Sequence, residues 1–355
     1  MHPTPDNKKL VEQFGAQPLS SLKTLPAHPS FHNGLLYSHR DFDAFYKAAQ
    51  QGKRVAIVTG VNASGTLHLG HKAVFDTVRF FQDSFDAEIY IPISDDESYV
   101  SGKVDSQEEA LKNSLRLARE LLAYGFHPDK TVFIIDQIYT NIYNLAFLLS
   151  KKITQSVVKA TYGYSGEDNI GLQFYPAVQS AHVLFPQHAH NVQHVLVPIG
   201  PDEDAHLRVA RDVAPRAGLA KPAVLHASFL PGTDGQKMSK SKNNAIFLSD
   251  SEKVIRKKIM SSFSGGQVTV EEHREKGGDP DVDVACQYLK AFYLSTEDAD
   301  GLFAQYRSGE ILSGEVKKLL ADYVVAELLS FQERVARIDD NTLRSCVLQN
   351  TNQGS

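Results

Sequence analysis

The chain has 355 residues, 42% of them hydrophobic and 22% charged, and a formal net charge of −5. This length and composition predict a globular protein of two domains, or of one large domain with an appendage. The negative balance excludes a protein that coats nucleic acid with a uniformly basic surface, but it leaves room for a local basic patch. Only two cysteines, Cys286 and Cys346, are present, and they form no CxxC pair, which argues against a disulfide framework.

The N-terminal segment carries no targeting signal that we can identify. It lacks the apolar run of a signal peptide, and the most apolar stretches of the chain are too short to cross a bilayer. We therefore expect a cytosolic protein with no membrane partner. Residues 1–30 are polar and predict a partly ordered arm, because prolines recur at Pro3, Pro5, Pro18, Pro26 and Pro29.

The next segments alternate between helical and extended patterns. Residues 38–53 predict a short amphipathic helix with Ser38 or Asp41 as its cap. The run RVAIVTG (54–60) is continuously apolar and ends in glycine, as in a strand buried on both faces of a parallel sheet. Further helices are expected at 71–85 and 106–125, and further strands at 87–95, 131–136, 192–200 and 223–229.

The helix expected at 106–125 has signals at both ends. Ser106 and Glu109 form a capping-box pattern, and Gly125 is a typical C-terminal stop. After about residue 251 only helical periodicity remains, in 251–263, 283–294 and 314–338. We expect an α/β fold: a Rossmann-type, doubly wound parallel sheet followed by a C-terminal α-helical domain. The predicted division is an N-terminal arm and helix (1–53), a catalytic domain (54–250) and a helical domain (251–355).

The stretch HLGH (68–71) follows the first predicted strand. Ligands bind at the carboxyl ends of strands in such folds, where the next helix offers free N–H groups and a positive dipole. His68 and His71 lie three residues apart, so both can face an anion, and Gly70 allows a flat ring to approach the backbone. The stretch matches neither GxxxxGK[ST] nor GxGxxG. Taken alone, it fits a phosphate contact and a pair of core histidines equally well.

A second unusual stretch, KMSKS (237–241), has no helical periodicity. Gly232, Gly235 and the pair Asn243–Asn244 flank it, so turn chemistry predicts a loop. A cationic loop with flexible shoulders either lies in solvent or closes over an anion.

Together, HLGH and KMSKS resemble the paired signatures of class I aminoacyl-tRNA synthetases. Further stretches, among them PISDDESY, RDVAPR, FLPGTDGQKMSKS, NNAIFLSD, FSGG and EEHREKGGDPDVDV, are similar to the tryptophanyl-tRNA synthetase family in its eukaryotic and archaeal branch. The similarity extends over roughly residues 8–330, with the signatures in the same order.

The resemblance implies a mechanism. An amino-acid carboxylate attacks the α-phosphorus of ATP, pyrophosphate leaves with Mg²⁺, and the adenylate is passed to the 3′-terminal adenosine of tRNA. Charge spreads over phosphate oxygens in the transition state, which suits lysine and hydroxyl donors on a closing loop. The implied catalytic residues are Lys237, Lys240, His68 and His71. The implied ATP-binding residues are His68, Gly70, His71, Gly200, Asp202, Lys237, Met238, Ser239, Lys240 and Ser241.

The resemblance also implies residues for the amino acid. Glu97 matches an acidic residue near the substrate ammonium, and Gln179 matches a polar residue of the pocket. The remaining implied substrate residues are Asp202, Thr59 and Gly60. The insertion at about 137–190 serves as a dimer interface in relatives, so a homodimer is expected.

Several positions depart from the family pattern. Val58 occupies the place of a pocket tyrosine, Pro92 that of a glutamine and Glu203 that of another glutamine, while Val61 replaces an arginine offered to ATP. An indole pocket needs a polar partner for its N–H group. The first hypothesis is therefore a tryptophan–tRNA ligase with a rearranged pocket. The alternatives are a paralogue that adenylates another amino acid without a need for tRNA, and a non-catalytic binding paralogue. The two intact signatures argue against the last.

Weaker features have simpler interpretations. The acidic residues at 95–97, with Asp202 and Asp204, are expected to contact substrate rather than to cage a metal, and no metal ligand is predicted. His188, His190 and His194 have ligand-like spacing but no nearby cysteine or acid, so a solvated face is favoured over a zinc site. The run KVIRKK (253–258) is either a basic patch for an RNA backbone or an exposed helix face.

Overall fold

The computed structural model describes residues 5–238 and 243–350. The chain forms two compact units, each built from separate stretches. The first comprises Met1–Ser38, Thr66–Thr77 and Ala227–Ala336, and the second comprises His39–Gly65, Val78–His226 and Arg337–Ser355. The three-part division expected from the sequence stays a prediction, because these units have other limits.

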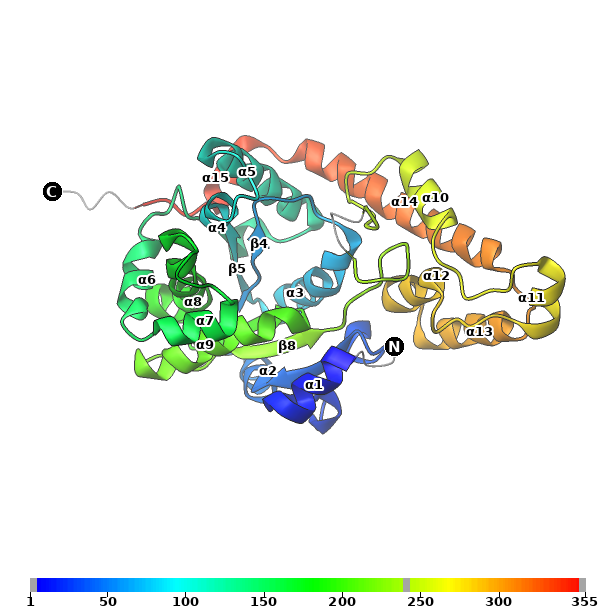
Figure 1. Ribbon diagram of the computed structural model, residues 1–355, viewed down its shortest axis with the longest axis horizontal. Coiled ribbons are helices and arrows are strands. Elements are labelled where there is room, and N and C mark those ends of the chain that lie inside the picture. The colour runs from blue at the N-terminus through cyan, green and yellow to red at the C-terminus, as the bar shows by residue number, and fades with distance from the viewer. Residues whose placement is uncertain (1–4, 239–242, 351–355) are drawn as a thin grey trace. The chain divides into compact units, whose positions relative to one another are not determined.

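A parallel β-sheet forms the centre of the second unit (Figure 1). Its strands run in the order β8-β7-β3-β5-β4, and β6 pairs with β5. All five of these pairings are parallel. The bounds are β3 Val55–Val58, β4 Val61–Asn62, β5 Glu88–Ser94, β6 Thr131–Ile135, β7 His194–Ile199 and β8 Ala223–Ala227. This confirms the doubly wound α/β fold expected from the alternating pattern.

A proline lies inside the central strand β5, where its missing N–H group would normally cost a ladder bond. The register explains why it is tolerated. Val58 pairs with Tyr90, and the next pair on that side joins Val61 to Ile93. Pro92 therefore lies opposite the break between β3 and β4. Since the Tyr90 carbonyl accepts from Thr59 on the same side, the N–H that Pro92 lacks would point at this break.

Helices cover both faces of the sheet. A cluster of buried apolar side chains joins Ala56 and Val58 to α6, α8 and α9. Because strand side chains alternate, Val55 and Ile57, also buried, face the other side, where α2 contacts β3 and β7. The helices and 3₁₀ turns of this unit are α2 Phe42–Gln50, α4 Asp95–Val100, α5 Gln107–Tyr124, η4 Pro128–Lys130, α6 Ile142–Ser150, α7 Gln155–Tyr162, α8 Ile170–His190, η5 Pro201–Glu203, α9 Asp204–Arg216 and α15 Asp340–Cys346.

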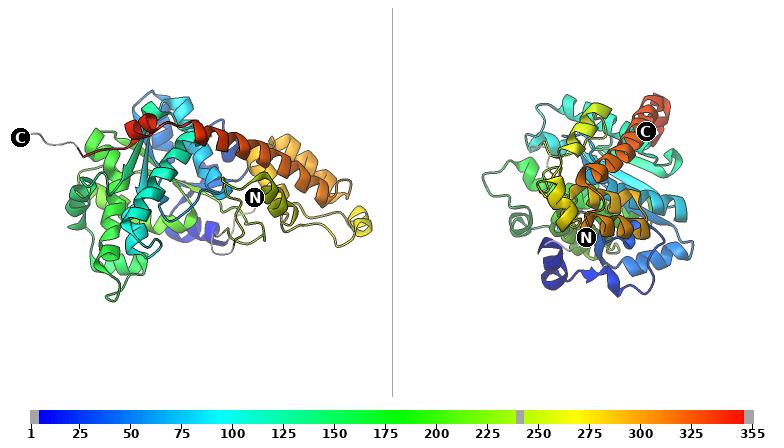
Figure 2. Two further views of the ribbon diagram at one scale, coloured as in Figure 1. Left: turned by 90° about the horizontal axis from the view of Figure 1, so that it is seen from above. Right: turned by 90° about the vertical axis from the view of Figure 1, so that its right-hand side faces the viewer.

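The first unit is mainly helical, and its longest element is the 25-residue helix α14 (Figure 2). Its elements are α1 Pro5–Phe14, β1 Gln17–Pro18, η1 Leu19–Ser21, η2 Pro29–Phe31, η3 Leu69–His71, α10 Glu252–Met260, α11 Val270–Lys276, α12 Val284–Tyr288, the π-helical turn η6 Leu289–Tyr293, α13 Thr296–Arg307 and α14 Ser313–Arg337. Strand β2 (Leu36–Arg40) and helix α3 (Lys72–Phe85) each pass from one unit into the other. No described helix is both long enough and apolar enough to traverse a membrane.

Most predicted elements are confirmed within a few residues, with two corrections. The helix expected from residue 38 begins at Phe42, because residues 38–40 belong to β2; Asp41 precedes it in a left-handed conformation, without a capping hydrogen bond from its side chain. The N-terminal arm also contains a regular helix, α1, which we had not expected. Both misses lie where pairing and packing, rather than local signals, decide the conformation.

Candidate functional site

The HLGH stretch forms a 3₁₀ turn just before α3, which begins at Lys72. His68 caps this turn: its Nδ1 accepts the Gly70 N–H at 3.1 Å. The His68 N–H donates in turn to His71 Nδ1 at 3.1 Å, and the two ring centroids lie 4.1 Å apart. The two histidines are thus brought together as expected, with both Nδ1 atoms used inside the turn.

The backbone N–H groups of this turn are not free, which corrects the expectation of a ready-made anion site. The Leu69 N–H donates to the Ile246 carbonyl at 3.0 Å, and the His71 N–H donates to the His68 carbonyl at 2.9 Å. The Lys72 N–H donates to Leu69. Any contact between this turn and an anion must therefore come from side chains, with the histidine Nε2 atoms the natural donors.

The segment that follows KMSKS pairs with the segment that leads into HLGH. Leu248 donates its N–H to the Leu67 carbonyl at 2.9 Å, and His68 forms an antiparallel bridge with Phe247. Gly70 lies against the start of the KMSKS stretch, because a Cβ at this position would come 3.1 Å from Met238 Sδ and 2.9 Å from the His68 ring. The structure therefore brings the two signatures together within one compact unit.

The loop expected around KMSKS is confirmed for the part that the structure describes. Lys237 is exposed, its Nζ lies 4.0 Å from the centre of the Phe229 ring, and its carbonyl accepts from Asn244 Nδ2 at 3.1 Å. Gly232 is close to the same asparagine, since a Cβ there would come 2.4 Å from Asn244 Nδ2. The remaining predicted loop residues, Ser239, Lys240 and Ser241, lie outside the described residues.

The carboxyl edge of the sheet in the second unit carries the predicted amino-acid residues. Thr59 is buried, and Gly60 lies next to β5, where a Cβ would make an ordinary contact of 3.5 Å with the Pro92 carbonyl. Val58 and Pro92, the two departures from the family pattern, are buried in the sheet. Gly200 precedes the turn η5, in which Asp202 is exposed.

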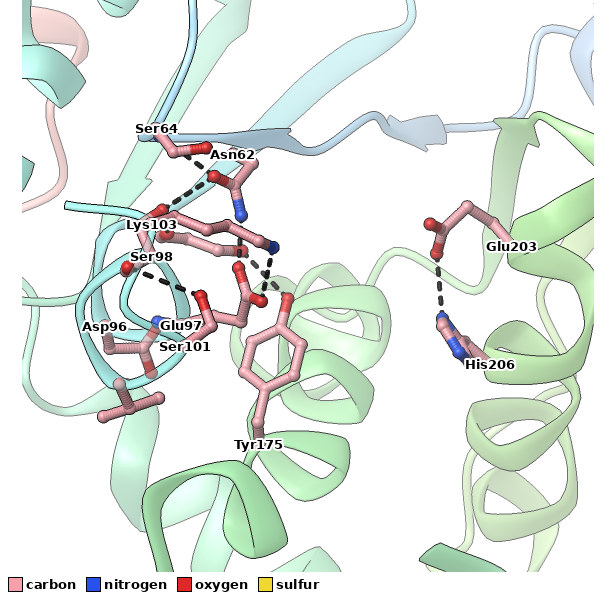
Figure 3. Close-up of polar contacts among 12 residues, drawn as sticks. Asn62, Ser64, Asp96, Glu97, Ser98, Ser101, Lys103, Tyr175, Glu203 and His206 are labelled. Carbon is pink, nitrogen blue, oxygen red and sulfur yellow. Dashed lines mark hydrogen bonds and ion pairs between the residues drawn. The ribbon is translucent and has the colours of Figure 1, made fainter. Parts of the chain in front are cut away.

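Glu97 already has a partner at each carboxylate oxygen (Figure 3). Lys103 Nζ lies 2.7 Å from Oε1, and Asn62 Nδ2 donates to Oε2. Only 9% of the Glu97 side chain is exposed. Glu97 is thus nearly buried and held by one cation and one amide, so it is less accessible to a further cation than an exposed carboxylate is.

Glu203 lies in a different environment, on the other side of the view in Figure 3. His206 Nδ1 is 3.1 Å from its Oε2, and 47% of its side chain is exposed. Burial opposes ionisation, but hydrogen bonds from His206 and Gln179 lower the pKa of Glu203 below its ordinary value. Gln179 also accepts from the Tyr162 hydroxyl at 2.6 Å. Gln179 and Glu203 thus join one network, and the positive charge of Lys103 also lowers the pKa of Glu203.

An aromatic stack supports this network. The rings of Tyr162 and His206 are parallel within 4° and have centroids 4.1 Å apart. Burial raises the pKa of Tyr162, so its hydroxyl stays protonated and donates to Gln179. No sequence pattern singles out Tyr162, His206, Lys103 or Asn62, because their roles depend on α7, α9, the turn after α4 and β4 meeting in three dimensions.

Asp204 is a structural anchor rather than a metal ligand. Its carboxylate is 1% exposed and accepts from Arg40 at 2.8 and 2.9 Å, and from His226 at 2.9 Å. Burial alone would raise the pKa of Asp204, but the hydrogen bonds from His226 and Arg40 lower it well below its usual range. The site fixes the start of α9 immediately after Glu203.

The other acidic residues gather elsewhere. Asp95 and Asp96 meet Asp136, with carboxylate oxygens of the three residues within 4.8 Å of one another. Asp95 accepts from the backbone N–H groups of Asp136 and Gln137, and Asp136 Oδ1 lies 2.7 Å from His182 Nε2. Burial and the neighbouring Asp136 raise the pKa of Asp96 to about 8. Protonation of Asp96 therefore reduces the negative charge that is buried in this cluster.

The structure also shows the surroundings of the histidine cluster and of the KVIRKK stretch. His190 Nδ1 lies 2.5 Å from the Tyr90 hydroxyl, which donates to Glu88, whereas His188 is exposed. These roles favour a structural reading of the histidine cluster. In the KVIRKK stretch, Arg256 pairs with Glu252 and Asp322, and Lys258 with Asp250, which leaves Lys253 and Lys257 as its exposed lysines.

Comparison with known proteins places the chain in a defined context. Residues 50–329 match the family model described as tRNA synthetases class I (W and Y). Tryptophan–tRNA ligase 2 of Halobacterium salinarum is 41% identical over 95% of this chain and 89% of its own. The tryptophan–tRNA ligase of Methanopyrus kandleri is 36% identical over 93% of this chain and 90% of its own.

Solved structures give the same picture for the fold. The crystal structure of tryptophanyl-tRNA synthetase from Aeropyrum pernix superposes with a TM-score of 0.89 at 29% identity, covering 97% of this chain and 96% of that one. The structure of the Encephalitozoon cuniculi enzyme bound to tryptophan has a TM-score of 0.86 at 28% identity, covering 98% and 99%.

Proposed function

The chain belongs to the class I tRNA synthetase family of the tryptophan and tyrosine type, and from this premise we propose that it is a tryptophan–tRNA ligase. It activates tryptophan with ATP to the aminoacyl adenylate and transfers the aminoacyl group to tRNA. The observation that carries the proposal is similarity to tryptophan–tRNA ligases over nearly the whole chain, with both signature stretches present and in contact. A chain that had lost adenylation would have no need of either stretch.

ATP is the ligand of the HLGH and KMSKS stretches. The Nδ1 atoms of His68 and His71 hold the turn, and we assign their Nε2 atoms to the phosphate oxygens. Lys237, Lys240, Ser239 and Ser241 supply charge and hydroxyl donors that offset the negative charge gathering on the phosphates. Gly70 is required because His68 and Met238 leave no space for a side chain there.

The amino acid is the ligand of the carboxyl edge of the sheet, where Thr59, Gly60, Gly200 and Asp202 also lie. The resemblance pointed to Glu97 for the substrate ammonium, but Lys103 and Asn62 occupy both of its oxygens. Glu203, ionised and half exposed beside Gln179, is far more accessible to a substrate than Glu97 is. We therefore assign the ammonium contact chiefly to Glu203 and Gln179, and give Glu97 the supporting role of holding Asn62 and Lys103.

Mg²⁺ enters this scheme with ATP. The described acidic group at Asp95, Asp96 and Asp136 is a poor fit for a magnesium cage, because Asp95 already accepts two backbone N–H groups and Asp136 is bonded to His182. Mg²⁺ usually keeps several waters and binds substrate phosphates with one or two carboxylates. We therefore assign no protein ligand to the metal.

The remaining partners follow from the reaction. We propose that tRNA is met by the helical residues 251–355, where Lys253 and Lys257 on α10 offer exposed charge to an RNA backbone. We also propose a homodimer through residues 137–190, and action in the cytosol, where tRNA is charged.

One alternative has a specific observation in its favour. Val58, Pro92 and Glu203 change three pocket positions of the family at once, and a carboxylate at position 203 suits a substrate with additional N–H donors. Adenylation of another amino acid is thus the second candidate.

The test of the proposed function is charging of tRNA with labelled tryptophan. We expect ATP-dependent transfer of label to total tRNA from the source organism, and its loss in Lys237→Ala. Attachment of a different amino acid would favour the alternative, and absence of charging with every amino acid would contradict the assignment.

A further inference from the structure

Helix α14 contacts residues next to both stretches that we assign to ATP, although it begins more than sixty residues after the second stretch. Within the first compact unit, side chains of α14 reach the residue that follows HLGH and the segment that follows KMSKS. Neither contact is needed to bury the apolar side of α14, which is formed by other residues such as Val324 and Leu328.

The first contact is a nearly buried cation. Lys72, next to His71, is 11% exposed, and its Nζ lies 2.6 Å from Glu327 Oε1 and 3.0 Å from Asp76. The other oxygen of Glu327 accepts from the Tyr293 hydroxyl at 2.6 Å. Phe292 and Tyr293 face the cation at 5.4 and 5.8 Å from their ring centres.

This arrangement keeps Lys72 charged. Burial would lower the pKa of Lys72, but Asp76 and Glu327 outweigh it and raise the pKa above its ordinary value. Phe292 and Tyr293 belong to η6, a π-helical turn of the kind that is frequent at functional sites. The ion pair thereby joins the first turn of α3, and the HLGH turn before it, to α14.

The second contact acts on the backbone. Gln332 Nε2 donates to the carbonyls of Leu248 and Asp250, both at 2.9 Å. Lys258 of α10 holds the other end of this segment through the Ala245 carbonyl at 2.8 Å. The same segment pairs with residues 67–69. Gln332 thus fixes the segment 245–250, which pairs with the residues that lead into the HLGH turn.

We propose that Glu327 and Gln332 of α14 are positioning residues for ATP: they hold the HLGH turn and the segment after KMSKS in register, so that His68 and His71 face the nucleotide. The proposal rests on the proposed function for its kinetic consequence. It does not concern the amino-acid residues of the sheet edge. It therefore predicts a lower kcat/KM for ATP with little change in the KM for the amino acid.

The test uses the full chain in ATP–pyrophosphate exchange. Glu327→Gln keeps an acceptor for Tyr293 but removes the charge facing Lys72, and Gln332→Ala removes both backbone contacts. We expect each variant to lower kcat/KM for ATP by about tenfold, with the KM for the amino acid changed by less than about twofold. Purely structural damage would reduce the fraction of active enzyme, measured by active-site titration, and leave both KM values unchanged.

Asp322→Asn is the matched control. Asp322 also lies on α14 and pairs with Arg256 at 2.7 Å, but both side chains are largely exposed, at 53% and 40%. We expect wild-type kinetics from this variant. Equal losses in Asp322→Asn and Glu327→Gln would overturn the proposal, and so would an unchanged kcat/KM for ATP in Glu327→Gln.

A second measurement tests the role of α14 without relying on the proposed enzymatic activity. Amide hydrogen exchange in the absence of any substrate should be faster in Glu327→Gln and Gln332→Ala for residues 67–69 and 246–248, and unchanged for β5 in the second unit. If the wild-type chain adenylated no amino acid, the proposed function would fail, but these exchange rates would still decide whether α14 holds the two segments. Unchanged rates in both variants would contradict it.

Discussion

Two carboxylates at the sheet edge, Glu97 and Glu203, differ in what already binds them, and this difference predicts different mutants. Glu203→Gln should raise the KM for tryptophan about tenfold or more, because a charged partner of the substrate ammonium is lost, while the KM for ATP stays unchanged. Glu97→Gln should have a smaller effect, since Lys103 and Asn62 occupy its oxygens in the wild type.

The same pair can be tested with an analogue. Indole-3-propionate lacks the ammonium group, so Glu203→Gln should bind it about as well as the wild type does, when measured by competition against tryptophan. If Glu203→Gln weakened the analogue and tryptophan equally, Glu203 would recognise something other than the ammonium, and our assignment would be wrong.

Asp204 predicts an effect on stability. Asp204→Asn removes the buried charge between Arg40 and His226, and breaking a buried ion pair costs about 3–5 kcal/mol. Chemical denaturation at pH 7 should show this loss. Asp212→Asn, on the exposed side of the same helix, should change the free energy of unfolding by less than about 0.5 kcal/mol.

The pH dependence has a definite direction. Because the pKa of Asp204 is lower in the folded state, its stabilisation is complete above the unfolded-state pKa of about 4 and is lost as the pH falls below that value. The difference in unfolding free energy between wild type and Asp204→Asn should therefore shrink between about pH 4 and pH 2. A difference that stayed constant over this range would exclude ionisation of Asp204 as its source.

At the scale of elements, helix α5 was predictable because both of its ends are set by local chemistry. Ser106 Oγ accepts the Glu109 N–H at 3.1 Å, and Gly125 ends the helix at φ 118°. Only the second half of the expected capping box differs, since Glu109 accepts from Asp105. Strand β3 was predictable for a similar reason, because a continuous apolar run suits a strand that is buried on both faces.

Other features could not be predicted because they depend on distant partners. Residues 38–40 look like the start of a helix but lie in β2, and the HLGH turn has its N–H groups taken by Ile246 and by its own residues. Likewise, no local sequence pattern indicates that Lys103 and Asn62 bind Glu97. The family resemblance named candidate site residues, whereas their hydrogen bonds are visible only in the structure.

The ends of α5 give a test of this distinction. Gly125→Ala should destabilise the protein by more than about 1 kcal/mol, because φ is positive and a Cβ would lie 3.0 Å from the Arg79 guanidinium. Gly301→Ala, inside α13 with no atom nearby, should instead stabilise it by about 0.5–1 kcal/mol. Thermal unfolding of the two variants measures both changes in stability. Changes of the same sign would contradict the prediction.

At the scale of the whole molecule, the apolar surface of residues 137–190 supports the proposed homodimer. Phe147 is 76% exposed and Ile170 81% exposed, both unusual for large apolar side chains. The same region contains a cavity of about 340 Å³ lined in part by Ile153, Val158 and Phe174. Large exposed apolar side chains mark surfaces that bind another protein, and we assign a second copy of this chain to this surface.

Phe147→Glu should therefore shift the protein from dimer to monomer in light scattering at micromolar concentration, because a charge would be buried at the interface. Asn144→Glu adds the same charge on the same helix at an exposed polar position and should leave the dimer intact. A wild-type monomer, or a dimer that survives Phe147→Glu, would argue against this interface.

The measurement that tests the central claim most directly is amino-acid-dependent ATP–pyrophosphate exchange, run with each of the twenty amino acids in the absence of tRNA. We predict exchange with tryptophan alone, which would show that a pocket with Val58, Pro92 and Glu203 still selects an indole. Exchange with another amino acid and not with tryptophan would contradict the claim and assign the chain to the alternative activity.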